Sequence, residues 1–113
     1  MATDIRATLQ NCSFSAQKTR LVIDLIRGKR AVEALNILKF SNRKVSDPVA
    51  KLLDSAISNA EENFGLNRDA LFIHTITADE ARTRKWRRFG ARGRFKPLLR
   101  RSSHITIVLR EKE

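Results

Sequence analysis

With 113 residues, 42% of them hydrophobic, the chain has the length of one domain and enough apolar material for a modest core, so we expect a single domain over residues 1–113. The lone Cys12 excludes an internal disulfide, no apolar run is long enough to cross a bilayer, and the early Asp4 argues against an acid-poor transit peptide. The net charge of +11 is concentrated at one end, because residues 1–81 carry 11 Lys and Arg against 10 Asp and Glu, whereas residues 82–113 carry 12 against 2.

The first predicted elements are a short strand and two helices. Ile5, Ala7 and Leu9 alternate with polar residues, which indicates a half-buried strand. Ser15 is placed to cap a helix that Gly28 would end. The apolar face of this helix is predicted to be Leu21, Val22, Leu25 and Ile26. A second, shorter helix ends at a loop over residues 41–43, and its predicted apolar face is Val32, Leu35 and Leu38.

The third predicted helix has the clearest signals. Asp47 is a good N-cap, and Pro48 then falls at the first helical position, where a missing N–H costs nothing. Gly65 is a natural end for the helix. Apolar residues recur between them at helical spacing, which is typical of a core face rather than a ligand site: Val49, Leu52, Leu53, Ala56, Ile57, Ala60 and Phe64.

After the third helix the hydrophobic period changes to two. Leu71, Ile73, Thr75 and Thr77 are predicted to share one face of a strand, and a second alternating strand covers residues 104–109. Between these strands the sequence Gly-Ala-Arg-Gly at residues 90–93 is the strongest turn signal. The predicted fold is therefore α+β: a small three-stranded, antiparallel-type sheet packed on three helices, with a long protruding β-hairpin.

The predicted hairpin is longer than the body of so small a protein. Residues 71–88 and 92–109 place 18 residues on each side of the turn. An extended ribbon of that length reaches about 60 Å, whereas a helical body of this size is only about 30 Å across. We therefore expect an arm over residues 79–101 to project from the body, and an isolated two-stranded ribbon is marginally stable in water.

The arm also carries most of the charge. Ten cations, eight of them arginine, fall within residues 82–101, which contain no acid: Arg82, Arg84, Lys85, Arg87, Arg88, Arg92, Arg94, Lys96, Arg100 and Arg101. Such a surface repels itself unless a polyanion neutralises it, and nucleic acid is the commonest polyanion. Arginine suits planar contacts with phosphates and bases. On charge alone, a membrane surface or an acidic protein remains open as the partner.

Three aromatic residues, Trp86, Phe89 and Phe95, are interleaved with these cations. On an arm without a core, they suit stacking on unpaired bases, although Phe95 equally suits packing within the ribbon. A disordered basic tail is the alternative interpretation of the segment. The well-patterned strand that follows, and the restriction of glycine to the middle of the segment, favour the hairpin.

The sequence contains no catalytic or cofactor signature, so we expect no enzyme, no metal and no cofactor. His74, His104 and Cys12 match no usual zinc spacing, although the two histidines are predicted to face each other near the root of the sheet. Asp79 and Glu80 are adjacent on a strand, so they point to opposite faces and cannot converge on one substrate. There is no phosphate-binding loop or nucleophile elbow.

Four blocks of the sequence resemble the large-subunit ribosomal protein twenty-two family of bacterial type. They are SAQKTRLVIDLIRGK at residues 15–29, ALNILKF at 34–40, LLDSAISNAEEN at 52–63 and SSHITIVLRE at 102–111. The resemblance runs in order from about residue 13 to the C-terminus, and four blocks in register are far more specific than any one alone. It implies the same fold: three helices on a small sheet, with a long hairpin.

The resemblance also implies a function. Members of this family bind large-subunit ribosomal RNA early in subunit assembly, contact neighbouring ribosomal proteins, and line the peptide exit tunnel with the hairpin tip, beside the nascent chain. By position, the tip corresponds to Arg84, Lys85, Trp86, Arg87, Arg88, Phe89, Gly90, Ala91, Arg92 and Gly93. RNA-facing cations near the first helix would be Lys18, Arg20, Arg27, Lys29 and Arg30. The expected location is a cytoplasmic ribosome, with an organellar ribosome left open.

The chain departs from the family pattern in the arm. It has Ala81-Arg82 where relatives commonly have Gly-Pro, Phe89-Gly90 where they commonly have Pro-Arg, and a bulky Trp86. The alternative function is a free DNA-architectural protein that places a basic ribbon in a groove, which would normally require a dimer. A membrane-active arm would need an amphipathic helical period, which the arm lacks.

Overall fold

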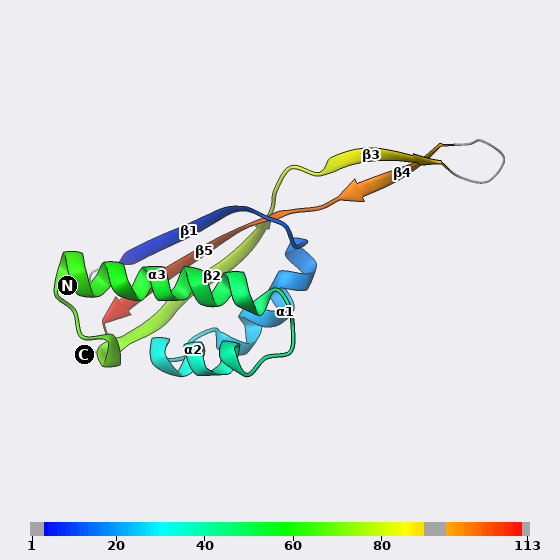
Figure 1. Cartoon of the computed structure of the whole chain (residues 1–113). Coiled ribbons are helices and arrows are strands. Elements are labelled where there is room, and N and C mark those ends of the chain that lie inside the picture. Colours follow the sequence, from blue (N-terminus) through cyan, green and yellow to red (C-terminus); the bar gives the residue numbers. More distant parts are fainter. Residues whose placement is uncertain (1–3, 90–94, 112–113) are drawn as a thin grey trace.

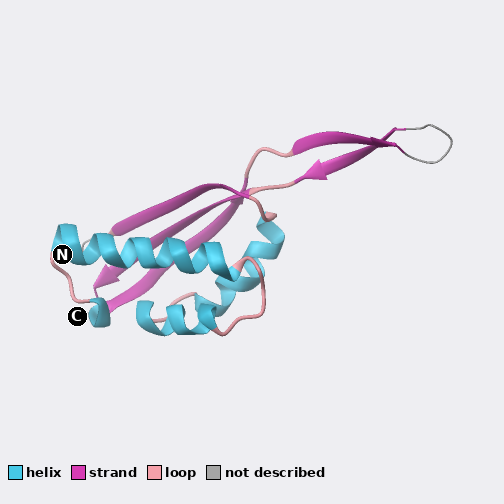
Figure 2. Ribbon diagram, viewed as in Figure 1, coloured by secondary structure: helices cyan, strands magenta, loops and turns pink. Residues whose placement is uncertain are grey.

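The computed structural model describes residues 4–89 and 95–111. Three helices lie on one face of a three-stranded antiparallel sheet, and a two-stranded hairpin projects from the end of that sheet (Figures 1 and 2). The elements in chain order are β1 (Ile5–Cys12), α1 (Ala16–Ile26), α2 (Ala31–Lys39), α3 (Ser46–Phe64), a 3-10 turn (Arg68–Ala70), β2 (Leu71–Glu80), β3 (Arg84–Phe89), β4 (Phe95–Arg100) and β5 (Ser103–Glu111). This architecture confirms the predicted α+β fold with a protruding hairpin.

The body sheet has the order β1-β5-β2, so the last strand of the chain lies between the first strand and β2. Strand β5 pairs antiparallel with both neighbours, Ile107 lying between Ala7 on β1 and Ile76 on β2. The register on β2 shifts between Ile73 and Thr75, where one extra residue interrupts the ladder. The buried positions therefore change phase along the strand.

This bulge makes the predicted alternation of β2 wrong beyond its first half. Leu71 and Ile73 are buried as predicted, but Thr75 is exposed and Thr77 is only half-buried. Ile76 and Ala78 occupy the core in their place. The extra residue moves every following side chain to the other face, because side chains along a strand alternate with a period of two.

Helix α1 begins as predicted, with the Ser15 side chain accepting a hydrogen bond from the Lys18 backbone N–H at 3.3 Å. Its predicted apolar face is partly wrong, because the side chains of Leu21 and Leu25 are 52% and 51% exposed. The side that packs on the sheet is instead Ala16, Thr19, Val22, Ile23 and Ile26. In α2, the buried residues are Ala31, Ala34 and Leu38, whereas Val32 and Leu35 are half-buried.

Helix α3 begins at Ser46, earlier than the predicted Asp47 cap implies. Val45 already has helical backbone angles and occupies the cap position without a side-chain hydrogen bond. Pro48 remains in the first turn, where its missing N–H has no helical acceptor to lose. The helix ends as predicted at Gly65, whose φ of 63° is left-handed. Phe64 is 49% exposed, so the predicted core stripe of this helix ends at Ala60.

The core lies between α3, α1 and the sheet. Its largest fully buried side chains include Ile57 from α3, Ile23 from α1, and Ile73, Ile107 and Leu109 from the sheet. The same cluster extends to α2 through Leu38. Since α1 lies beside β2 and α3 lies across β1 and β5, the helices cover one face of the sheet from edge to edge (Figure 1).

The hairpin forms a separate sheet rather than a continuation of the body sheet. Strands β3 and β4 pair only with each other, and residues 81–83 and 101–102 interrupt both strands between the two sheets. The projecting arm makes the molecule 64 Å long and only 25 × 19 Å across, which agrees with the length expected for a ribbon of this size. The predicted single ribbon is therefore divided at its root.

Candidate nucleic-acid interface

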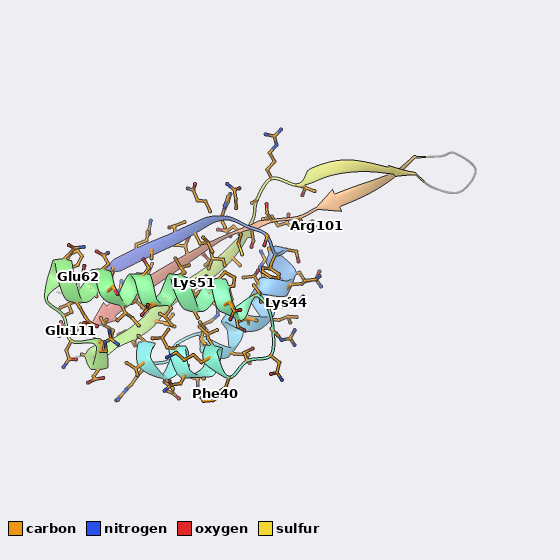
Figure 3. The ribbon with its side chains drawn as sticks, in the orientation of Figure 1. Phe40, Lys44, Lys51, Glu62, Arg101 and Glu111 are labelled. Carbon is orange, nitrogen blue, oxygen red and sulfur yellow. The ribbon has the colours of Figure 1, made fainter. Side chains whose placement is uncertain are left out.

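The root of the arm is held by two hydrogen bonds between its strands. The Ala81 backbone N–H donates to the Ser102 carbonyl at 3.0 Å, and the Ser102 hydroxyl donates to the Arg82 carbonyl at 3.0 Å. Arg82 and Arg101 lie on either side of this joint and are both exposed (Figure 3, where Arg101 is labelled). The polar contacts of Ser102 thus tie together the two strands on which these cations lie.

Beyond the root, the β3–β4 register places cations opposite cations. Arg84 pairs with Arg100 and Arg88 pairs with Lys96, and no residue of either strand is acidic. Like charges at directly opposed positions of an antiparallel pair are destabilising. The pairing of the arm is therefore opposed by its own charge, and a polyanion bound along it would relieve that repulsion. Five predicted positions lie outside the described residues: Gly90, Ala91, Arg92, Gly93 and Arg94.

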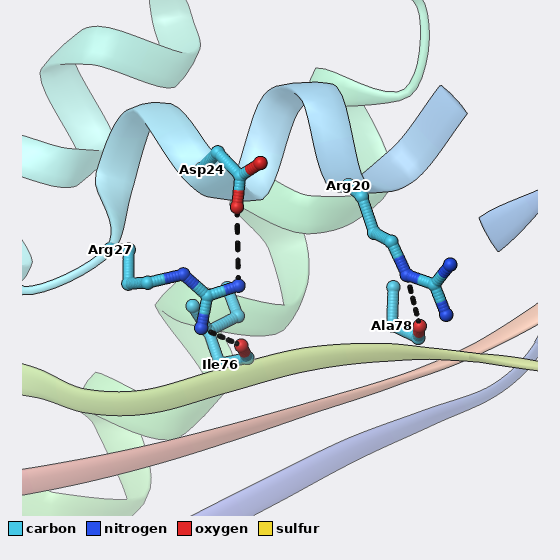
Figure 4. Close-up of polar contacts among 5 residues, drawn as sticks. All are labelled: Arg20, Asp24, Arg27, Ile76 and Ala78. Atoms are coloured by element: carbon cyan, nitrogen blue, oxygen red, sulfur yellow. Dashed lines mark hydrogen bonds and ion pairs between the residues drawn. The ribbon is translucent and has the colours of Figure 1, made fainter. Parts of the chain in front are cut away.

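Two of the predicted RNA-facing cations in the body make contacts within the protein. The Arg20 side chain donates from Nε to the Ala78 carbonyl at 3.0 Å, and Arg27 donates from Nη1 to the Ile76 carbonyl at 2.7 Å (Figure 4). Arg27 also pairs with Asp24 of its own helix at 3.2 Å. These contacts fasten α1 to β2, which is an edge strand, and satisfy carbonyls that no neighbouring strand pairs. Both arginines therefore have a structural role that the sequence did not reveal.

Two of the three other predicted body cations, Lys29 and Arg30, lie along the same edge. The Lys29 carbonyl accepts a hydrogen bond from the Ile73 N–H at 2.9 Å, and Arg30 forms an isolated bridge with Phe72. Lys18 lies in the first turn of α1, and the side chains of Lys18, Lys29 and Arg30 are exposed. Lys29 and Arg30 thus add two exposed cations to the edge of β2, at the end of the strand far from the arm.

The described residues offer no arrangement for acid–base or metal chemistry. Asp79 lies opposite His104 and Glu80 opposite Ser103 in the β2–β5 ladder. The two histidines do not face each other as predicted, because His74 lies at the bulge, while His104 Nδ1 accepts a hydrogen bond from the Asn11 N–H at 3.1 Å. Within the described residues, no three His, Cys, Asp or Glu side chains gather as metal ligands. No described helix combines the length and apolar character needed to span a membrane.

One notable surface residue was not predicted from the sequence. Phe40 follows the last turn of α2 and its side chain is 86% exposed. Its place after Lys39, just before the predicted loop, was the only signal in the sequence that the ring lies outside the helical apolar stripe.

Comparison with known proteins identifies the family. The model of the family described as ribosomal protein L22p/L17e matches residues 7–110. A large ribosomal subunit protein uL22 of Thermoanaerobacter sp. (strain X514) is 48% identical over 110 residues, which cover 97% of this chain and 99% of that protein. The proteins of the same name from Pediococcus pentosaceus and Dehalococcoides mccartyi (strain CBDB1) are 46% and 45% identical, covering 98% and 94% of this chain and 94% and 97% of their own lengths. The chain therefore belongs to the ribosomal protein L22p/L17e family, and as a bacterial-type member it is a non-enzymatic protein of the large ribosomal subunit.

Proposed function

We propose that this protein binds large-subunit ribosomal RNA through the arm and the adjoining edge of β2, and so supports assembly of the subunit. The observation that carries the proposal is a two-stranded arm that projects from the body (Figure 1), has no acidic residue in either strand and places cation opposite cation at two of its paired positions. Phosphates of RNA would neutralise these charges and release condensed counterions, which supplies a favourable free energy of binding. Exposed Arg82 and Arg101 at the root, with exposed Lys18, Lys29 and Arg30 on the body, add to this basic surface.

The proposed binding set is therefore the one expected from the sequence, with two residues serving a double purpose. Arg20 and Arg27 hold β2 through a single N–H each, and a guanidinium has five N–H donors, so these contacts leave donors for phosphate. Their internal contacts fix the position of the charge before RNA binds. A preorganised cation loses less conformational freedom on binding than a freely moving one.

We also propose that the tip of the arm, residues 84–93, lines the peptide exit tunnel and lies beside the nascent chain. The support is the family to which the chain belongs and the projection of β3 and β4 away from the body. The relatives named above are all bacterial, which favours the cytoplasmic ribosome of a bacterium over an organellar one. The sequence departs from the family pattern at Trp86 and Phe89-Gly90 in this tip, and at Ala81-Arg82 at the root of the arm.

The DNA-architectural alternative has no comparable support, because neither the family nor the relatives point to DNA. The buried faces of the three helices pack in the core of one chain. A dimer that would bring two arms to one duplex has no basis among the described residues.

Titration of RNA binding against salt tests the proposed function. We expect the logarithm of the association constant for bacterial large-subunit ribosomal RNA to fall linearly with the logarithm of salt concentration, with a slope of about 0.7 to 0.9 for each phosphate contacted. Replacing Arg84 by Ala should lower that slope by about one unit or less, and so should replacing Arg101 by Ala. A salt-independent affinity, or equal binding to duplex DNA of the same length, would reject the proposal.

The tunnel proposal needs a separate test in assembled ribosomes. A variant lacking residues 84–93 is expected to enter the large subunit, because the body and root cations remain. The response of the ribosomes to macrolide antibiotics should change, because the hairpin tip in this family helps form the tunnel constriction where these antibiotics act. The control is a subunit carrying the full-length chain. An unchanged macrolide response in subunits that contain the shortened protein would contradict the position of the tip, but not the RNA binding.

A further inference from the structure

Phe40 presents an aromatic ring to solvent on a fixed part of the backbone. Its side chain is 86% exposed, the largest exposure among the exposed large hydrophobic residues of the described chain. Its backbone N–H donates to the Asn36 carbonyl at 3.2 Å, and the next N–H, that of Ser41, donates to the Leu38 carbonyl at 3.2 Å. Figure 3 shows Phe40 on the outer side of α2, away from the sheet. The ring is therefore held at a defined position outside the core.

Phe40 lies where its ring cannot contribute to the hydrophobic core. Helix α2 packs through Ala31, Ala34 and Leu38, and Phe40 adds no surface to that buried stripe. An aromatic side chain left in water contributes little hydrophobic stabilisation, since that term scales with the area removed from water. A single exposed apolar residue is common on protein surfaces, so exposure alone does not indicate a binding site. The neighbouring residues decide whether the ring could bind a partner.

The charged residues nearest to Phe40 in the sequence are basic. Lys39 precedes the ring, Arg43 and Lys44 follow it within four residues, and all three are exposed. Between Glu33 and Asp47 the sequence has no acidic residue, and none of the three cations belongs to an ion pair of the described structure. The Arg43 N–H donates to the Ser41 hydroxyl at 3.3 Å, which gives the loop a local turn. A fixed ring among cations that lack an ion pair is the pattern used to bind unpaired nucleotides.

We propose that Phe40 stacks on an unpaired base of large-subunit ribosomal RNA while Lys39, Arg43 and Lys44 contact the adjacent phosphates. This site lies on the α2–α3 connection, in the body, and is distinct from the arm and from Lys29 and Arg30 beside β2 (Figure 3). The inference rests on the proposed RNA-binding function. RNA is favoured over a neighbouring protein because one ring suffices to stack on a base, whereas a stable protein interface buries about 1,200 Å² or more with an apolar centre.

A tryptophan reporter measures the proposed stacking directly. Trp86 is the only tryptophan, so a double variant that combines Trp86→Phe with Phe40→Trp carries one indole, at the site itself. On addition of bacterial large-subunit ribosomal RNA, we expect quenching of the indole fluorescence, since the ring would stack on a base. The matched control combines Trp86→Phe with Phe64→Trp, because Phe64 is also exposed but follows Glu61 and Glu62. Its fluorescence should not change when RNA is added.

Affinity measurements separate stacking from charge. Phe40→Ala should weaken RNA binding roughly 5- to 150-fold, the range for loss of one stacked base, whereas Phe40→Trp should preserve it and Phe64→Ala should leave it unchanged. Replacing Lys39, Arg43 and Lys44 together by Gln should lower the salt slope by up to about three units. Because Phe40 is exposed, these variants are expected to keep the circular dichroism spectrum of the original chain.

The outcome for this site is distinguishable from that for the arm. The measurements are repeated in a chain in which residues 84–100 are replaced by a short Gly-Ser turn. If Phe40→Ala leaves affinity unchanged in both backgrounds while arm replacement weakens it, the second site is rejected and the proposed function stands. The site is also rejected, in favour of a protein contact, if the fluorescence of the Phe40→Trp reporter is unaffected by RNA but shifts to the blue on addition of large-subunit proteins. A salt-independent affinity of the full-length chain would reject the proposed function itself.

Discussion

At the scale of single residues, the orientation of α1 determines which of its apolar side chains are buried against the sheet and stabilise the fold. Ile23 is fully buried between the helix and the sheet, whereas Leu25 is 51% exposed. We expect Ile23→Ala to lower the free energy of unfolding by about 2 to 5 kcal/mol, and Leu25→Ala by about 0.5 kcal/mol or less. Urea denaturation followed by circular dichroism measures both. Equal losses from the two substitutions would contradict the observed orientation of the helix.

The sequence could not fix this orientation, because residues 21–26 contain five apolar side chains within six positions. A helical period fits Leu21 and Leu25 nearly as well as Ile23 and Ile26. The deciding residue is Thr19, which is polar yet buried: its hydroxyl donates to the Ser15 carbonyl at 2.9 Å and lies 3.4 Å from the Ser103 hydroxyl. A threonine that is buried because its hydroxyl finds hydrogen-bond partners in the folded chain cannot be recognised from the pattern of hydrophobic residues.

A second residue-level feature joins the two ends of the chain. Asp4 accepts hydrogen bonds from Arg110, one of them from Nη2 at 3.3 Å, and lies directly before β1. The hydrogen bond from the Arg110 guanidinium holds the pKa of the Asp4 carboxyl below its ordinary value, and the charge of Arg110 acts in the same direction. The same hydrogen bond raises the pKa of Arg110.

This pair predicts a pH dependence of defined sign. Because the pKa of Asp4 is lower in the folded chain than in the unfolded one, the pair stabilises the fold above the unfolded pKa. That contribution is lost as the pH falls through the folded pKa. In Arg110→Ala, the NMR titration of the Asp4 carboxyl should move upward toward the ordinary value. The contribution is expected to be small, since both side chains are substantially exposed and salt screens them. A titration unchanged by Arg110→Ala would show that the pair does not form in solution.

At the scale of elements, the attachment of α1 to the edge of β2 gives Arg27 a role independent of any ligand. Arg27→Ala removes a charge-assisted hydrogen bond to the Ile76 carbonyl, so it should destabilise the free protein by about 1 to 3 kcal/mol. Lys18→Ala is the matched control, because its side chain makes no described hydrogen bond, and it should change stability by about 0.5 kcal/mol or less. Thermal unfolding without RNA provides the measurement. If both variants unfold like the original chain, Arg27 serves only an external partner.

The elements themselves could largely be predicted from sequence, while their internal irregularities could not. Ser15, Gly65 and the alternation of β5 gave the right helix start, helix end and strand. The bulge after Ile73 was invisible, because inserting one residue in a strand changes pairing without changing composition. The start of α3 was misplaced because Asp47 and Pro48 suit a cap and a first position equally well when the preceding turn is unknown. The site residues Arg20 and Arg27 were recognised as cations, but their carbonyl acceptors depend on tertiary packing.

At the scale of the whole molecule, the body and the arm are held by different forces. Every described residue of the buried cluster belongs to the body, between Ile5 and Ala78 or between Ile105 and Leu109, and β3 and β4 pair only with each other. The arm extends the molecule to 64 Å and opposes cation to cation. Sequence alone indicated this division, because charge and apolar content separate along the chain. The break at residues 81–83 was not predicted, since nothing in the local sequence marks the end of one sheet and the start of another.

This division predicts that the body folds without the arm. Replacing residues 84–100 by a short Gly-Ser turn removes eight cations and no acid, which lowers the net charge from +11 to +3. Since β3 and β4 form a sheet of their own and self-repulsion falls when they are removed, the urea midpoint of the free protein should stay the same or rise at low salt. The salt slope of RNA binding should fall sharply, because most of the phosphate contacts proposed for the arm are removed. Urea titrations at low and high salt separate these effects, because a stability gained by relieving repulsion vanishes when the charges are screened. Loss of the cooperative unfolding transition in this variant would mean that the body needs the arm in order to fold. The arm would then not serve RNA binding alone.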